Sequence, residues 1–282
     1  MEVKKDNRFK ENSLENIKSK YLLQQIFNFL QENKSLKIAK YNKKIQKRLD
    51  KNINDYINYK KVIIEIIPIN IKDINIFINY KEEKKKYYHI YFNDEKEEIN
   101  RNYFTKDENI VKIKIIIDYQ ISSFEELFKD CVCIEKISFI RFKRNDINNM
   151  GSMFFNCSSL KELNLNNFNT DNVTDMSLMF YCCSTLKELN LKNFNTNNVT
   201  SMYSMFFKCS SIKELNLNNF NTNNVTDMRG MFYECSSLKE LNLNNFNTNN
   251  VTDMSFMFRR CLDELKLKIK SQFKNFKKLN IY

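Results

Sequence analysis

Glycine, proline and histidine are almost missing from this sequence of 282 residues, which has two glycines, one proline and one histidine. Glycine occurs only at positions 151 and 230, so the sequence contains no glycine-rich loop that could cradle a phosphate group. The single histidine, His89, cannot form a metal site built from several histidines, and no motif supports a cysteine–histidine pair for nucleophilic catalysis. We therefore expect no enzymatic activity, no cofactor and no metal site.

Long apolar segments are also missing. The segment before Tyr21 is rich in charge and lacks the apolar core of a signal peptide. No run approaches the roughly 18 apolar residues that a membrane-spanning helix needs. We expect a cytoplasmic protein without a membrane span, whose eight cysteines stay reduced. Export to the cell surface by a route that leaves no recognisable signal is the alternative.

The chain has a formal net charge of +12, but the excess of basic groups lies at the two ends, in residues 1–60 and 251–282. Residues 61–250 are close to neutral and contain no nucleic-acid-binding motif, so we expect no nucleic-acid partner. Lysine, asparagine and isoleucine are abundant, as the codons of an AT-rich genome would produce. We attribute the excess of lysine and asparagine to codon usage.

A regular repeat dominates the second half of the chain. The cysteines at positions 157, 183, 209, 235 and 261 are equally spaced, and the methionines at 153, 179, 205, 231 and 257 have the same spacing. Leucine, phenylalanine and valine positions keep the same step. About six units run from residue 121 to the end of the chain, which is the pattern of a repeat protein.

One unit contains two apolar patterns. Leu163 and Leu165 alternate with polar residues, which predicts a short strand with one buried face. Val173, Met176 and the apolar residues after them recur three and four residues apart, which predicts a short helix that begins near Asn172. Each unit is therefore predicted to be strand, loop and helix, stacked on its neighbours in a parallel arrangement.

The consensus of the unit, CSSLKELNLxNFNTxNVTxMxxMF, resembles the BspA-like leucine-rich repeat over residues 121–265. That family is known from surface proteins of bacteria and protists. The resemblance implies an α/β fold: a right-handed leucine-rich-repeat-type solenoid of about six 26-residue strand–helix units. It also implies a protein-binding role.

Six of the eight cysteines share one apolar position of the repeat, where a free thiol behaves as a small hydrophobic group. We expect a buried column of thiols, with disulfides between neighbouring units as the alternative. The ten methionines of the repeats fall at apolar spacing and are expected to be core.

The exposed side of the predicted strands is the candidate ligand face. Because Leu163 and Leu165 point inward, their neighbours point outward, and the later units repeat this arrangement. The face consists of Glu162, Asn164, Asn166, Glu188, Asn190, Lys192, Glu214, Asn216, Asn218, Glu240, Asn242 and Asn244. It has no aromatic or arginine anchor of the kind that dominates specific protein interfaces. It suits a repetitive ligand, a second solenoid or no ligand.

Residues 14–30 and 36–49 have the periodicity of two amphipathic helices joined by residues 31–35. Leu22, Ile26, Phe27 and Leu30 provide the apolar side of the first helix, and Lys40 and Lys43 belong to a basic ridge on the second. Residues 14–50 faintly resemble an F-box, which implies a Skp-type adaptor as partner. From the sequence we expect instead a helical hairpin that only packs on the array, with the F-box-like module as the alternative.

Short alternating runs in 62–80 and 87–118 predict strands, and residues 93–98 predict a turn between two of them. The predicted domains are a helical N-terminal module (1–60), a β-rich cap (61–120) and the solenoid with a basic C-terminal end (121–282). The predicted function is a non-enzymatic protein-interaction scaffold, with a substrate receptor of an F-box-type ubiquitin ligase as its most specific form. A BspA-like surface protein or adhesin is the alternative.

Overall fold

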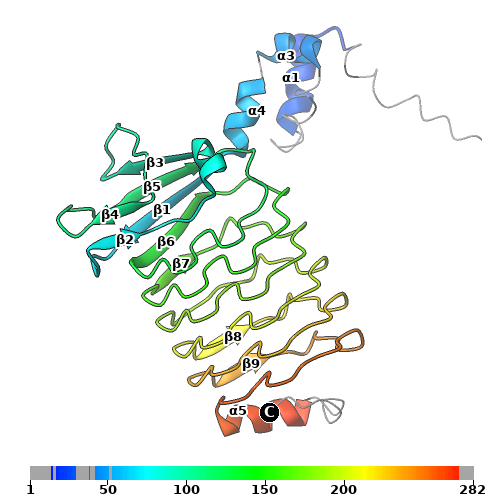
Figure 1. Ribbon diagram of the computed structural model, residues 1–282. Helices are drawn as coiled ribbons and strands as arrows, with labels where there is room; N and C mark the ends of the chain where they lie inside the picture. Colours follow the sequence, from blue (N-terminus) through cyan, green and yellow to red (C-terminus); the bar gives the residue numbers. More distant parts are fainter. Residues whose placement is uncertain (1–13, 15–16, 30–37, 39–41, 51–52, 273–282) are drawn as a thin grey trace, which may run out of the picture. The chain divides into compact units, whose positions relative to one another are not determined.

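The computed structural model (Figure 1) describes residues 14, 17–29, 38, 42–50 and 53–272. The chain divides into two units, Met1–Lys60 and Lys61–Tyr282. Each unit has its own apolar core, so each is described by itself.

The first unit is helical. Its helices are α1 (Lys20–Phe29), α3 (Lys43–Leu49) and α4 (Ile53–Lys60). Leu23 and Phe27 of α1 pack with Ile45 and Leu49 of α3, and all four side chains are buried. The predicted helices are present in the described residues, although α1 begins at Lys20 rather than at residue 14. The predicted link at 31–35, together with Leu30 and Lys40, lies outside the described residues.

The second unit begins with strands, as the alternating runs predicted. They are β1 (Val62–Pro68), β2 (Ile74–Ile76), β3 (Tyr88–Phe92), β4 (Tyr103–Thr105), β5 (Ile113–Ile117), β6 (Ile134–Arg141), β7 (Glu162–Asn164), β8 (Glu214–Asn216) and β9 (Glu240–Asn242), with a 3-10 helix η2 (Glu82–Tyr87) and a final helix α5 (Asp263–Gln272). Five strands form one sheet in the order β3-β5-β1-β6-β7, and β2–β4 and β8–β9 form two smaller sheets.

The five-stranded sheet joins the predicted cap to the repeats. Strand β1 pairs antiparallel with β5 and β6, whereas β6 pairs parallel with β7 of the next unit. Val62, Ile64 and Ile66 of β1 are fully buried, whereas Ile63 and Ile67 on its other face are not. Because β6 and β7 belong to the repeats, the sheet crosses the predicted boundary between residues 120 and 121. Figure 1 shows the sheet at one end of the repeats and α5 at the other.

Residues 121–261 form a stack of units held by parallel contacts, which we call the repeat stack. A series of single β-bridges links one residue of each unit to its equivalent in the next, from Ser123 to Asn149 and onward to Asp253. The residues that follow each bridge form turns. Backbone N–H groups in the turns of one unit donate to backbone carbonyl groups of the next unit. Phe154 N donates to Met179 O at 2.9 Å, and Phe180 N donates to Met205 O at 2.9 Å.

The prediction of a leucine-rich-repeat-type solenoid of strand–helix units is wrong. The segments predicted as helices, such as residues 173–183, contain turns and no helix, so the fold is mixed and sheet-rich with few helices. Leu178 and Cys182 have φ angles of 58° and 57°, and this left-handed conformation interrupts a right-handed helix. Gly151 and Gly230 lie in the equivalent turns of their own units.

Turns and helices place side chains at similar intervals, which explains the error. Alternate N–H groups bond three residues back, as Met179 N does to Met176 O at 3.4 Å, and the others bond to the next unit. Two consecutive turns therefore direct Met176, Met179, Phe180 and Cys183 inward, and all four are fully buried. Apolar spacing of three and four residues is common to both structures.

The core of the repeat stack consists of columns, in each of which the same residue type recurs at the same position of successive units. Phe180 lies 5.6 Å, ring centroid to ring centroid, from Phe154 in the preceding unit and from Phe206 in the next, and the rings are nearly parallel. All ten methionines of the repeats are buried, as predicted. Leu265 and Ile269 of α5 are also buried and belong to the same core.

Asparagine side chains connect the units at the surface, so their abundance has a structural role that codon usage does not explain. Asn221 Nδ2 donates to Asn197 Oδ1 at 2.7 Å, and Asn224 Nδ2 donates to the backbone carbonyl of Asn197 at 2.7 Å. The same two contacts recur one unit later, with Asn247 and Asn250 as donors and Asn223 as acceptor. A buried hydrogen bond of this kind typically contributes about 1 kcal/mol, and exposed ones contribute less.

Candidate binding groove

A groove runs along the strand side of the repeat stack, and we call it the strand groove. It consists of two overlapping hollows, one of about 710 Å³ from Lys136 to Asn190 and one of about 830 Å³ from Lys187 to Asn242. Leu189, Leu215 and Leu241 are buried beneath it and form part of its floor. Polar and charged side chains of successive units form its walls.

Ten of the twelve residues predicted for the ligand face line the strand groove. They are Glu162, Asn164, Asn166, Glu188, Asn190, Glu214, Asn216, Asn218, Glu240 and Asn242. Lys192 and Asn244 are exposed but lie outside its lining. The structure therefore brings the residues of four units together on one hollowed face.

One asparagine column of the groove also shapes the backbone. Asn216 Oδ1 accepts a hydrogen bond from Asn218 N at 3.0 Å, which closes a turn at the end of β8. The asparagines at 164, 190 and 242 make the same contact two residues ahead, at 3.0–3.1 Å. Each carbonyl oxygen thus accepts one hydrogen bond, and its second lone pair and the amide N–H groups are what these side chains can offer to a ligand.

The charges of the groove form two columns along the stack. The glutamate column is Glu162, Glu188, Glu214 and Glu240, and the lysine column is Lys161, Lys187, Lys213 and Lys239. In the pairing of β8 with β9, Glu214 lies directly opposite Glu240, so like charges face each other. Like charges opposite each other on neighbouring strands destabilise a sheet.

Opposite charges neutralise both ends of the glutamate column and the Lys161 end of the lysine column. Lys136 Nζ lies 2.5 Å from Glu162 Oε2, and Lys268 Nζ of α5 lies 2.7 Å from Glu240 Oε1. Lys161 Nζ lies 2.7 Å from Glu135 Oε1. Glu135 and Lys136 come from β6 in the first unit of the repeat stack, and Lys268 comes from α5, which follows the last unit.

The middle of the groove has no such partners. Within the described ranges, the side chains of Lys187, Glu188, Lys213 and Glu214 have neither an ion-pair nor a hydrogen-bond partner. All four are exposed. The groove therefore presents two adjacent positive and two adjacent negative groups to whatever enters it.

The lysine column was missed by the sequence analysis, which selected only residues on the outward side of the strand alternation. Lys187 and Lys213 precede the strand positions proper, yet both line the groove. These lysines recur once in every unit of the sequence, and this recurrence could have predicted that they form a column.

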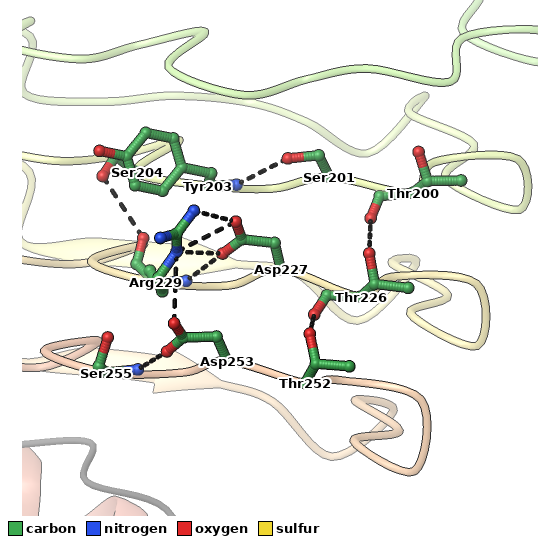
Figure 2. A network of polar contacts seen from close by, with 10 residues as sticks. All are labelled: Thr200, Ser201, Tyr203, Ser204, Thr226, Asp227, Arg229, Thr252, Asp253 and Ser255. Carbon is green, nitrogen blue, oxygen red and sulfur yellow. Dashed lines mark hydrogen bonds and ion pairs between the residues drawn. The ribbon is translucent and has the colours of Figure 1, made fainter.

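Aromatic and arginine side chains are exposed elsewhere on the stack, in the turns shown in Figure 2. Arg229 Nη2 lies 2.6 Å from Asp227 Oδ2, and the Arg229 guanidinium carbon lies 5.0 Å from the ring centroid of Tyr203. Arg229 Nε also lies 3.5 Å from Asp253 Oδ2 in the next unit (Figure 2). A backbone hydrogen bond from Ser255 and the charge of Arg229 help to lower the pKa of Asp253. None of these residues lines the strand groove, and their groups are already engaged with one another.

The thiols of the repeat column are buried and make contacts with backbone carbonyl groups. Cys209 Sγ lies 3.1 Å from the backbone carbonyl of Phe180 in the preceding unit, and four other cysteines of the column repeat this contact at 2.9–3.2 Å. Burial raises the pKa of every thiol in the column, and it raises that of Cys133, outside the column, to about 12. All eight cysteines are free, as expected of a thiol column, so no disulfide joins the units.

The single histidine lies half-buried on β3, between two carboxylates. His89 Nδ1 is 3.0 Å from Glu98 Oε1, and His89 Nε2 is 3.2 Å from Asp118 Oδ2. In the described part of the chain, no group of three or more histidine, cysteine or acidic residues could hold a metal ion.

These features define a class: a repeat protein with a polar groove along one side of its stack. A family model described as "Mycoplasma protein of unknown function, DUF285" matches residues 122–215 and 148–272. Together these matches cover more than half of the 282 residues, so the chain belongs to this family. The match does not extend over residues 14–50. No curated protein and no solved structure matches the chain.

Among the described helices, none is long and apolar enough to cross a membrane.

Proposed function

We propose that this chain is a non-enzymatic protein-interaction protein that binds its partner in the strand groove. The observation that carries the proposal is the set of exposed charges without partners at the middle of the groove, on Lys187, Glu188, Lys213 and Glu214. Like charges on adjacent units repel each other, and a bound partner with complementary charges would remove this cost.

The side chains that could do chemistry support a non-enzymatic role. Both ring nitrogens of His89 face carboxylates, and five thiols of the repeat column face backbone carbonyls at 2.9–3.2 Å. Burial raises the pKa of these thiols, which keeps them protonated and poorly nucleophilic near neutral pH.

Site-specific photocrosslinking in the native cell tests this proposal. A benzophenone amino acid replaces Asn218, which is exposed and lines the groove, and in a second strain it replaces Lys96, which is exposed outside it. We expect a protein that crosslinks from position 218 and not from 96. After purification, the crosslinked partner should bind the unchanged chain. It should not bind the Lys187→Glu, Lys213→Glu double variant. Equal crosslinking from both positions, or binding that the double variant retains, would contradict the proposal.

For the location of the protein, we propose the cytoplasm, which the eight free thiols support. The alternative is a surface protein or adhesin like those that carry BspA-like repeats, and the family match over the same repeats is compatible with it. Protease treatment of intact cells separates the two, because a surface protein is digested and a cytoplasmic protein is protected.

For the helical N-terminal unit, we propose a docking role toward an adaptor of the Skp type, as the resemblance to an F-box implies. Tyr21 and Leu22 of α1 are 71% and 56% exposed, and Ile26 is 37% exposed, so this helix presents an apolar side. Phe27, grouped with them in the sequence, is buried against α3 instead. A substrate receptor of a ubiquitin ligase would hold its adaptor here and its substrate in the strand groove.

A further inference from the structure

The strand groove has a spacing along the stack that limits what can occupy it. Neighbouring strands lie about 4.8 Å apart, so two steps from unit to unit cover about 9.6 Å. The buried phenylalanine column of this stack has a longer step of 5.4–5.6 Å, measured between ring centroids. A ligand that lies along the stack must repeat its charges at nearly this interval.

An α-helix meets this interval and an extended chain does not. On one side of a helix, a row that advances three and then four residues covers about 10.5 Å, which differs from two unit steps by about 1 Å. In an extended chain, two steps between side chains on the same face cover about 13.4 Å, which differs by about 4 Å. Over the single step from Glu188 to Glu214, a helix row advances about 4.5–6 Å and an extended chain about 6.7 Å, so the helix is the better match to the strand spacing of about 4.8 Å.

Ion pairs at the ends of the groove show which charge can lie beside each column. A lysine from α5, Lys268, lies 2.7 Å from Glu240, and Lys136 lies 2.5 Å from Glu162. Glu135 lies 2.7 Å from Lys161. Three of the four end positions are thus matched by an opposite charge, whereas Lys239 has no such partner among the described residues. Lys187, Glu188, Lys213 and Glu214 are likewise unmatched.

From this charge pattern and spacing we propose that the strand groove binds an α-helix of a partner protein, laid along the stack. One row of its side chains is acidic and faces Lys187 and Lys213. The neighbouring row is basic and faces Glu188 and Glu214. This inference rests on the proposed function, since it specifies the partner of the same groove. A nucleic acid would be repelled by the glutamate column, and a polyamine by the lysine column.

Binding of designed peptides to the full chain tests the inference. The first probe is an alanine-rich helix with a row of glutamates and a neighbouring row of lysines. A second probe has the same composition with the charges scattered around the helix, and a third is the first probe with a central proline, which breaks the helix. Fluorescence anisotropy at low ionic strength measures the affinities.

We expect the two-row helix to bind about tenfold or more tightly than either control. A few surface ion pairs together contribute about the free energy that corresponds to this factor. The variant Lys187→Glu, Lys213→Glu should lose about tenfold of this affinity. The control variant Lys84→Glu, Lys96→Glu makes the same change in net charge at exposed positions outside the groove lining and should keep it.

Three results would overturn the inference. Equal binding of the proline-containing probe would indicate an extended ligand, and equal binding of the scattered probe would remove the requirement for rows. A change of oligomeric state in the Lys187→Glu, Lys213→Glu variant, seen by sedimentation, would identify a second copy of the chain as the occupant. If no peptide binds while position 218 still crosslinks a partner, the helix is wrong and the proposed function stands; if both fail, both are wrong.

Discussion

The hydroxyl of Thr196 makes two hydrogen bonds to the backbone of Asn221 in the next unit. Asn221 N donates to Thr196 Oγ1 at 2.8 Å, and Thr196 Oγ1 donates to Asn221 O at 2.8 Å. Thr196 is 1% exposed, and Thr170 and Thr222 make the same pair of contacts with the units that follow them. One hydroxyl thus satisfies both polar groups of a residue 25 positions away.

Replacing Thr196 by valine should destabilise the repeat stack. Thr196→Val keeps the shape of the side chain and leaves the N–H and carbonyl groups of Asn221 without their partner, at a cost of about 2 kcal/mol. Urea unfolding measures the change. The matched control is Thr200→Val, because Thr200 is exposed and its single contact to Thr174 O is 3.2 Å long. Equal losses for the two variants would show that the double contact of Thr196 is unimportant.

Gly230 occupies a left-handed position in a turn, with φ of 59°, and a Cβ atom there would lie 3.0 Å from Ser204 Oγ. Gly230→Ala should therefore cost about 1–2 kcal/mol. The control is Gly151→Ala, since Gly151 does not have a positive φ and its Cβ would meet flexible side-chain atoms at 3.2 Å. We expect the control to lose less stability in thermal unfolding, and the opposite order would contradict the turn geometry.

The buried thiols should make the protein sensitive to alkali. Burial raises their pKa above the usual 9.0, to about 11 for Cys261 and about 12 for Cys133. From pH 9 upward the unfolded chain releases thiol protons that the folded chain retains, so stability falls as pH rises toward the folded pKa values. The slope is at most about 1.4 kcal/mol per pH unit for each buried thiol. Urea midpoints between pH 7 and pH 10 measure it.

A variant with fewer thiols provides the comparison for this pH dependence. Cys209→Ala combined with Cys235→Ala should be less stable at pH 7, because both thiols are buried and bond to backbone carbonyls. Its stability should nevertheless fall less steeply above pH 9. An unchanged slope would mean that other groups cause the alkaline loss.

The turn that Asn216 closes should depend on its side-chain oxygen. Asn216→Ala removes the acceptor of Asn218 N and should cost about 0.5–1 kcal/mol. Asn216→Asp keeps an acceptor at the same place and should cost less. Asn218→Ala is the control, because the contact with Asn216 uses its backbone N–H and survives the change. Thermal unfolding of the three variants would contradict the turn if all of them lost equally.

The helical N-terminal unit should be removable without loss of the rest. Residues 61–282 form one of the two units, so we expect this fragment to remain soluble and to keep its melting temperature. A Skp-type adaptor should be recovered with the full chain and not with the fragment. Aggregation of the fragment, or a melting temperature several degrees lower, would favour the alternative that residues 1–60 only pack on the array.

The sequence by itself determined which side chains are buried. The period of the repeat placed Met179, Phe180 and Cys183 in the core, and alternation placed Ile113 and Ile115 on the buried face of β5, because the apolar side chains of either pattern gather on one side of the backbone. It also predicted ten of the residues that line the strand groove, since the residues between inward-pointing leucines must face outward.

Only the tertiary structure decided which backbone conformation the repeated apolar pattern adopts and which charges of the groove have partners. Whether residues 173–183 form a helix or two turns depends on where alternate N–H groups find their acceptors, and these acceptors lie in the neighbouring unit. The ion pair between Lys268 and Glu240 likewise joins residues 28 positions apart through the packing of α5. Periodicity along the chain is the same for a helix and for repeated turns, so a hydrogen bond to a distant segment makes the difference.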